Sequence, residues 1–121
     1  MTWLPISESD ICALIDDSYA RMSHEQKKYW EIIKVAPRKW VQSPWGDEGG
    51  GFWVVAIIGK YVIWFNDIEY GFNRSEYSNI GVIDGYFCNQ DELEWQVQNV
   101  INQIHRGSDG AIYAGPPKPI V

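Results

Sequence analysis

Residues 52–65 read FWVVAIIGKYVIWF, two apolar runs separated only by Gly59 and Lys60. A two-residue connection that begins with glycine suits a type II′ turn, so this stretch predicts a β-hairpin. The runs 52–58 and 61–65 are apolar at successive positions rather than at alternate ones, which is typical of strands covered on both faces. We therefore expect these two strands to lie at the centre of a sheet.

Weaker strand signals stand on either side of the hairpin. Before it, residues 29–35 are rich in strand formers and are followed by Pro37, which we expect to end that strand, while residues 40–42 are a second short candidate. After it, large apolar residues alternate along 68–72, as in a half-exposed strand, and residues 80–83 supply one more. The sequence predicts an antiparallel sheet of four to five strands.

Helix signals occur at both ends of the chain. Ser7 suits the N-cap of a first helix, and Ser23 with Gln26 has the spacing of a capping box that opens a second short helical segment. Asn89 is the expected N-cap of a last helix that ends before Gly107. That helix carries an apolar stripe made of Leu93, Val97, Val100, Ile101 and Ile104, with Trp95 off the stripe. We expect one α+β domain over 1–107, its sheet flanked by the N-terminal and C-terminal helices, and an irregular tail over 108–121.

Composition and charge narrow the class of protein. The chain has 121 residues, of which 45% are hydrophobic and 21% charged, as in an ordinary globular domain. Its net charge is −6, and residues 40–105 hold nine acidic residues against two basic ones, whereas residues 18–39 hold six basic against two acidic. The acidic stretch would repel a phosphate backbone, so we expect no nucleic-acid partner. It would attract a basic protein.

Cysteine usage and the chain's start indicate the compartment. Cys12 and Cys88 match no metal or redox spacing, and residues 1–10 do not form a charged-then-apolar leader. The longest apolar run is far shorter than the roughly 20 residues of a membrane helix. We expect a cytoplasmic protein with no membrane partner. No sequence pattern indicates a cofactor or a metal, since residues 49–51 are not followed by the rest of a phosphate-binding loop.

Candidate catalytic groups are few. Asp67 and Glu69 follow a buried strand, and they would project to the same side if that strand continued, so they could share a proton or hold a hard cation. Asn66 and Asp67 are also an ordinary turn pair. His24 and His105 lie at expected helix ends without the neighbours of a nucleophile. A hydrolase using the two carboxylates is therefore a weaker hypothesis than a non-enzymatic protein, and we assign no catalytic residue.

The aromatic content suggests two kinds of binding site. Aromatic residues make up 15% of the chain and include seven tryptophans, which suit a core or a partner surface. One hypothesis places a protein partner on an acidic face around Asp47, Glu48, Asp67 and Glu69 beside large aromatics. The alternative is a small-molecule or carbohydrate site lined by tryptophans and a tyrosine, with Asp67 and Glu69 as polar contacts. The aromatic members of this site are Trp45, Trp53, Trp64 and Tyr70.

Several strings resemble a family of small uncharacterised bacterial proteins. They are GGGFWVVAIIG at 49–59, VIWFNDIE at 62–69, GFN at 71–73 and CNQDEL at 88–93. The resemblance spans roughly residues 29–104 and implies no particular activity. In size, charge and structural class the chain is also similar to the acidic immunity proteins of bacterial toxin systems. That looser resemblance implies a cytoplasmic binding protein whose partner is a basic toxin.

Overall fold

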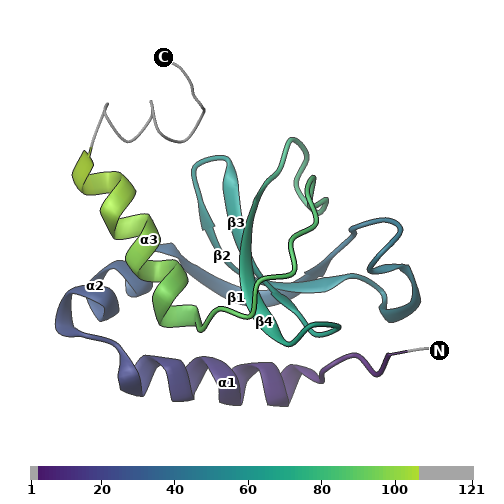
Figure 1. The fold of residues 1–121 in the computed structure, drawn as a ribbon, viewed down its shortest axis with the longest axis horizontal. Helices are drawn as coiled ribbons and strands as arrows, with labels where there is room; N and C mark the ends of the chain where they lie inside the picture. Colours follow the sequence, from purple (N-terminus) through teal and green to yellow (C-terminus); the bar gives the residue numbers. More distant parts are fainter. Residues whose placement is uncertain (1–2, 107–121) are drawn as a thin grey trace.

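The computed structural model describes residues 3–106 and shows an α+β fold with one four-stranded antiparallel sheet (Figure 1). The strands lie in the order β1-β2-β3-β4, so each strand pairs with its neighbour in sequence. The elements in chain order are α1 (Glu8–Arg21), α2 (His24–Ile33), β1 (Lys34–Trp40), the 3₁₀ turn η1 (Asp47–Gly49), β2 (Phe52–Ile58), β3 (Tyr61–Asn66), β4 (Gly71–Glu76) and α3 (Leu93–Arg106). The predicted fold class is confirmed, with helices from both ends of the chain beside the sheet.

The central hairpin is the one that the sequence predicts. β2 and β3 pair from Ile58 opposite Tyr61 inward, and Gly59 has a φ of 58°, a left-handed value that glycine adopts without steric cost. β2 and β3 are the two inner strands. Their side chains enter two separate clusters of buried residues, one on each face of the sheet. Continuous hydrophobicity therefore did indicate strands covered on both faces.

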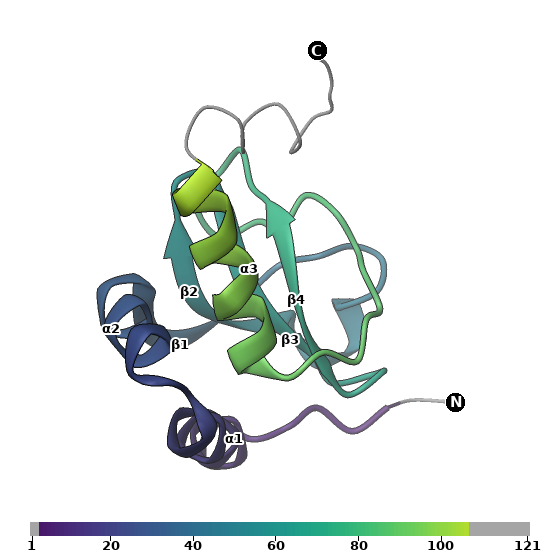
Figure 2. The same ribbon diagram turned by 60° about the vertical axis from the view of Figure 1, so that its left-hand side comes forward.

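The two faces of the sheet are covered in different ways. One face carries the three helices, and its core combines side chains of β2, β3 and β4 with apolar residues of α1, α2 and α3. The other face carries loops instead, and its core centres on Phe52 and Trp64 with Ile83 and Tyr86 from the connection between β4 and α3. Figure 2 shows the helices to one side of the sheet and the loops to the other.

The first two helices begin where their capping residues predict. The Ser7 hydroxyl accepts a hydrogen bond from the amide of Asp10. Ser23 and Gln26 form a complete capping box, in which each side chain accepts from the other residue's amide. These bonds satisfy amides that have no partner within their own helix.

The boundary between α2 and β1 differs from the prediction. Residues 29–33 belong to α2 and not to a strand, because Trp30 and Ile33 lie on the buried face of a helix that the capping box has already opened. β1 begins at Lys34, and Pro37 lies inside it instead of ending it. Proline is tolerated there because β1 is an edge strand and its register with β2 shifts between Lys34 and Arg38.

The strand predicted over 68–72 is wrong in its first half. Residues 67–70 form a turn, and β4 begins at Gly71. The buried Asn66 side chain stabilises the turn by accepting from the amides of Ile68 and Glu69. Tyr70 has a φ of 61°, a left-handed conformation that is uncommon outside glycine. The segment 80–83 is not a strand either, since only Val82 bridges to Val41.

The last helix begins three residues later than the Asn89 cap predicts. α3 starts at Leu93, and Asn89 instead exchanges two hydrogen bonds with the fully buried Asn73 of β4. Asn89 is therefore held in place through its backbone, and its side chain does not cap α3. The predicted stripe is buried at its first four positions, while Ile104 is exposed and Trp95 lies at the surface as expected.

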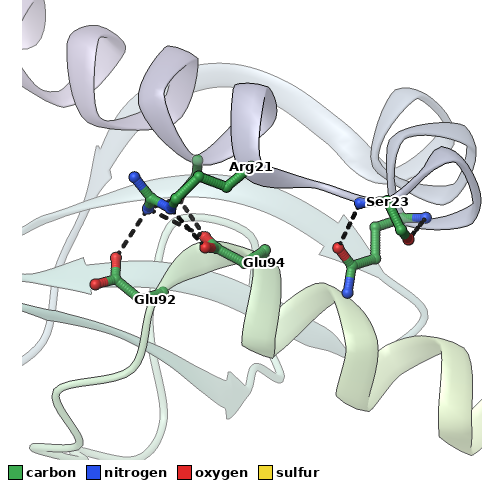
Figure 3. A network of polar contacts seen from close by, with 6 residues as sticks. Arg21, Ser23, Glu92 and Glu94 are labelled. Atoms are coloured by element: carbon green, nitrogen blue, oxygen red, sulfur yellow. Dashed lines mark hydrogen bonds and ion pairs between the residues drawn. The ribbon is translucent and has the colours of Figure 1, made fainter.

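A polar network joins α1 to the first turn of α3 (Figure 3). The buried Glu94 carboxylate accepts from the Arg21 guanidinium and from the hydroxyl of Ser18. Arg21 also reaches Glu92 at 3.0 Å. Burial alone would raise the pKa of Glu94, but these donors hold it below its ordinary value. The network therefore links the N-terminal helix α1 directly to the start of the C-terminal helix α3.

Two further expectations concern the C-terminal tail and a membrane-spanning helix. The predicted tail over 108–121 lies outside the described residues. Within residues 3–106, no helix has the length and hydrophobicity needed to cross a bilayer.

Candidate functional site

Two long loops lie on the side of the sheet opposite the three α-helices. They comprise residues 41–51, between β1 and β2, and residues 77–88, after β4, and we call them together the loop face. Backbone hydrogen bonds join them, since the amide of Val41 donates to Gly81 and the amide of Ile83 donates to Val41, both at 2.8 Å. The two loops are therefore joined to each other.

Each loop is also braced internally. The hydroxyl of Ser43 donates to Asp47 at 2.7 Å, and the hydroxyl of Ser78 donates to Asp84 at 2.8 Å. Gly51, the last residue of the first loop, approaches the end of β1 so closely that a Cβ there would lie 2.2 Å from the carbonyl oxygen of Trp40. These contacts favour a single loop conformation.

Large apolar side chains are exposed across the loop face. Their exposed fractions lie between 38% and 74%, and they belong to Val41, Trp45, Ile80, Val82 and Phe87. Trp45 stacks on Tyr86 with ring centroids 4.7 Å apart, and Tyr86 in turn packs on the buried rings of Phe52 and Trp64. The exposed indole is thus supported from below by the aromatic core.

The charges of the loop face are all of one sign. Residues 41–51 and 77–88 contain Asp47, Glu48 and Asp84 and no lysine or arginine. The ammonium of Lys39 approaches from β1 and donates to the Gly49 carbonyl, while Lys60 at the hairpin turn pairs with Glu76. These two ammonium groups are therefore already engaged.

The eight binding residues proposed from sequence do not form one site. Trp45, Asp47 and Glu48 lie on the loop face. Trp64 is fully buried, and Trp53 belongs to the core cluster on the opposite, helix-covered face. The structure does not bring Trp45, Trp53, Trp64 and Tyr70 together. Trp53 pairs with Phe65, the residue after Trp64 in β3, and successive residues of a strand point to opposite faces of the sheet.

The other predicted residues lie near α1. Asp67 and Tyr70 line a hollow of about 540 Å³ beside α1, and Asp10 and Asp17 line it as well. Asp67 Oδ2 accepts from the amide of Ile6 at 2.8 Å, and within residues 3–106 its buried Oδ1 has no hydrogen-bond partner. Burial raises the pKa of Asp67 above its ordinary value, although the hydrogen bond from the Ile6 amide favours the charged form.

These positions argue against the carboxylate pair of a hydrolase. Glu69 is exposed in the turn and does not line the hollow that Asp67 lines. The strand continuation that would have aligned the two side chains is absent, since residues 67–70 are a turn. Among residues 3–106, no group of three or more histidine, cysteine or acidic side chains is placed to hold a metal ion.

Of the exposed apolar residues on the loop face, sequence reasoning found Trp45 and missed Val41, Ile80, Val82 and Phe87. The sequence pattern places Val41 and Ile80 in short strands, where part of their surface would be buried. The available signal was their isolation, because Ile80 stands between Asn79 and Gly81, two turn-forming residues. A lone apolar residue in a turn has few ways to be covered within its own chain.

Comparison with known proteins adds no relative. No protein-family model, no curated protein and no solved structure matches this chain.

Proposed function

We propose that this protein is a non-enzymatic binding protein whose loop face contacts a protein partner. One observation carries the proposal: large apolar side chains are exposed on two braced loops that contain acidic residues and no basic ones. Exposed apolar patches on a small domain are typical of interaction sites. The matching partner surface is apolar at its centre and basic at its rim.

The apolar residues supply the affinity. Trp45 and Phe87 are aromatic side chains of the kind that contributes most binding energy when a partner removes water around them. Their support differs, since Trp45 rests on Tyr86 and stands above the core. Trp45 is therefore the expected centre of the contact.

The acidic residues select the partner and speed its approach. Asp47, Glu48 and Asp84 share the two loops with the apolar side chains, and the whole chain carries a net charge of −6. Such a field attracts basic surfaces and repels nucleic acids. Because the loops are already held by hydrogen bonds, little conformational entropy is lost when the partner binds.

An immunity-like role fits these properties. A small acidic α+β protein that covers a basic toxin needs a preformed, acidic and partly apolar surface, and the loop face has each of these features. A small-molecule or carbohydrate site lined by the predicted aromatics has no comparable support, because Trp64 is buried.

Parallel affinity captures test the proposal. The wild type and a triple variant, Trp45→Ser with Ile80→Ser and Phe87→Ser, are used to capture proteins from lysates of the cells that naturally produce the chain. A matched control carries Trp95→Ser and Ile104→Ser, which remove exposed apolar side chains from α3. Circular dichroism verifies that each variant is folded.

The expected result is a basic protein bound by the wild type and the α3 control but not by the loop-face variant. The Kd of the purified partner should then rise at least tenfold in the loop-face variant alone. A partner that binds the loop-face variant normally and loses affinity for the α3 control would contradict the proposal.

A further inference from the structure

A second surface hollow lies between α1, α2 and the edge strand β1, with a volume of about 490 Å³. It lies on the helix-covered side of the domain, and none of its lining residues belongs to the loop face. Figure 2 shows α2 and β1 on the side of the molecule away from the long loops. The hollow is therefore separate from the proposed partner surface, and the two can be tested independently.

The interior of this hollow is mainly apolar. Ile15 and Cys12 contribute from α1, and Val35 and Pro37 contribute from β1 above the buried Trp30. Ligand pockets for small molecules commonly measure about 300–1,000 Å³ and combine an apolar lining with a few polar groups. The hollow fits that description in size and in lining.

One charge on its rim is uncompensated. The ammonium of Lys34 pairs with Glu31 at 2.8 Å, so these two rim charges neutralise each other. The nearby Lys27 lies outside the lining and packs over the ring of Tyr19. Asp16 forms no ion pair with any residue in the part of the chain that the structure describes. The lining therefore carries one free negative charge beside an apolar interior.

We propose that this hollow binds a small organic cation, a single ammonium group on an aromatic or branched apolar body. The body would contact Ile15, Val35 and Pro37, and the ammonium would pair with Asp16 at the rim. A carboxylate on the same body would be repelled by Asp16, and a neutral analogue would lose the charge contact. The free carboxylate thus sets the ligand class, and the apolar lining sets its shape.

The two cysteines provide a selective readout. Cys12 lines the hollow, while Cys88 is exposed elsewhere and does not. The native protein is alkylated with iodoacetamide in the presence of phenethylamine, 2-phenylethanol or 3-phenylpropionate, and mass spectrometry follows each thiol. Phenethylamine should slow alkylation of Cys12 and leave Cys88 unchanged. The alcohol should need higher concentrations, and the carboxylate should protect least.

Two adjacent acids on α1 give a matched pair of variants. Asp16→Asn should raise the phenethylamine concentration for half-protection by about fivefold, as expected for a partly exposed charge pair. Asp17→Asn makes the same change in net charge at a residue that does not line this hollow, and it should leave the concentration unchanged. Ala36→Tyr, at an exposed lining position of β1, should fill the hollow and abolish protection.

Three results would overturn the proposal. The first is the absence of Cys12 protection at 10 mM phenethylamine, about the weakest affinity that a specific site for so small a ligand should show. The second is equal protection by the amine, the alcohol and the carboxylate, which would remove the role of Asp16. The third is equal loss of protection in Asp16→Asn and Asp17→Asn, which would assign the effect to net charge.

Discussion

The guanidinium of Arg21 donates through Nε to Oε2 of Glu94 at 2.7 Å, and this contact joins α1 to α3 across 73 positions of the chain. The same carboxylate accepts from the hydroxyl of Ser18 at 2.8 Å. Glu94 is buried, and a buried charge is costly unless it is hydrogen-bonded. The donors of Arg21 and Ser18 meet that need. The contact joins two helices of the layer that covers one face of the sheet, and the loop face lies on the other.

Removing this carboxylate should destabilise the protein. Glu94→Ala leaves the buried hydroxyl of Ser18 without its acceptor, and we expect a loss of about 2 kcal/mol in the free energy of unfolding. Urea denaturation measures the change. Glu92→Ala is the control, because Glu92 is half-exposed and its contact with Arg21 should contribute less than about 1 kcal/mol. An equal loss of unfolding free energy in the two variants would contradict the larger contribution that we assign to Glu94.

The same residue predicts a loss of stability in acid. The donors around Glu94 hold its pKa in the folded state below the ordinary value of 4.5, so the folded state favours the ionised form. Its stabilising contribution is therefore present above about pH 4.5 and is lost as the pH falls through the lower folded pKa. The difference in unfolding free energy between wild type and Glu94→Gln should shrink over that interval. A constant difference from pH 7 to pH 3 would argue that the charge is irrelevant.

Asp67 predicts the opposite dependence on pH. Burial raises the pKa of Asp67 above 3.8, so its ionised form is less favourable in the folded state than in the unfolded state. Stability should fall as the pH rises from the ordinary value through the raised one. Asp67→Asn can still accept from the Ile6 amide and should be more stable than wild type at neutral pH. Thermal unfolding at pH 7 and pH 3 tests this, and the gain should vanish in acid.

On the loop face, we expect different residues to control the dissociation rate and the association rate of a partner. Trp45→Ala should weaken binding by about 2 kcal/mol, mainly through faster dissociation. Charge reversal at Asp47 and Glu48 should instead slow association by about tenfold at low ionic strength. Stopped-flow kinetics at low and physiological salt measures both effects. An on-rate that ignores salt and the charge reversal would leave the acidic residues without a role in binding.

Gly71 should tolerate substitution poorly. A Cβ at this position would lie 2.3 Å from the Cα of Gln90, so β4 and the segment before α3 would have to separate. We expect Gly71→Ala to cost about 3 kcal/mol of stability. Gly59→Ala is a useful comparison, because a Cβ there meets no atom within 4 Å and only the left-handed φ opposes it. That substitution should cost about 1 kcal/mol, and a reversed order in chemical denaturation would contradict the close packing at Gly71.

Local interactions made part of this fold predictable from sequence. The turn at Gly59 and Lys60 joins residues that are adjacent in the chain, so its glycine and the flanking apolar runs were sufficient to predict the central hairpin. The caps at Ser7 and Ser23 act over three residues and were predicted for the same reason. The acidic character of residues 40–105 follows from the amino-acid sequence alone.

The remaining features depend on contacts between distant residues. Residues 29–33 have strand-forming side chains, but burial of Trp30 and Ile33 against the sheet outweighs that weak preference. Asn89 has a side chain that suits an N-cap, yet its backbone amide and carbonyl are hydrogen-bonded to the side chain of the buried Asn73, 16 positions away. Trp45 and Trp64 are the same residue type, and only the stacking of the loops on the sheet makes one exposed and the other buried. Sequence thus determined the hairpin, the first caps and the charge, whereas the surface that a partner can reach was decided by tertiary packing, because burial depends on which distant segments cover each face.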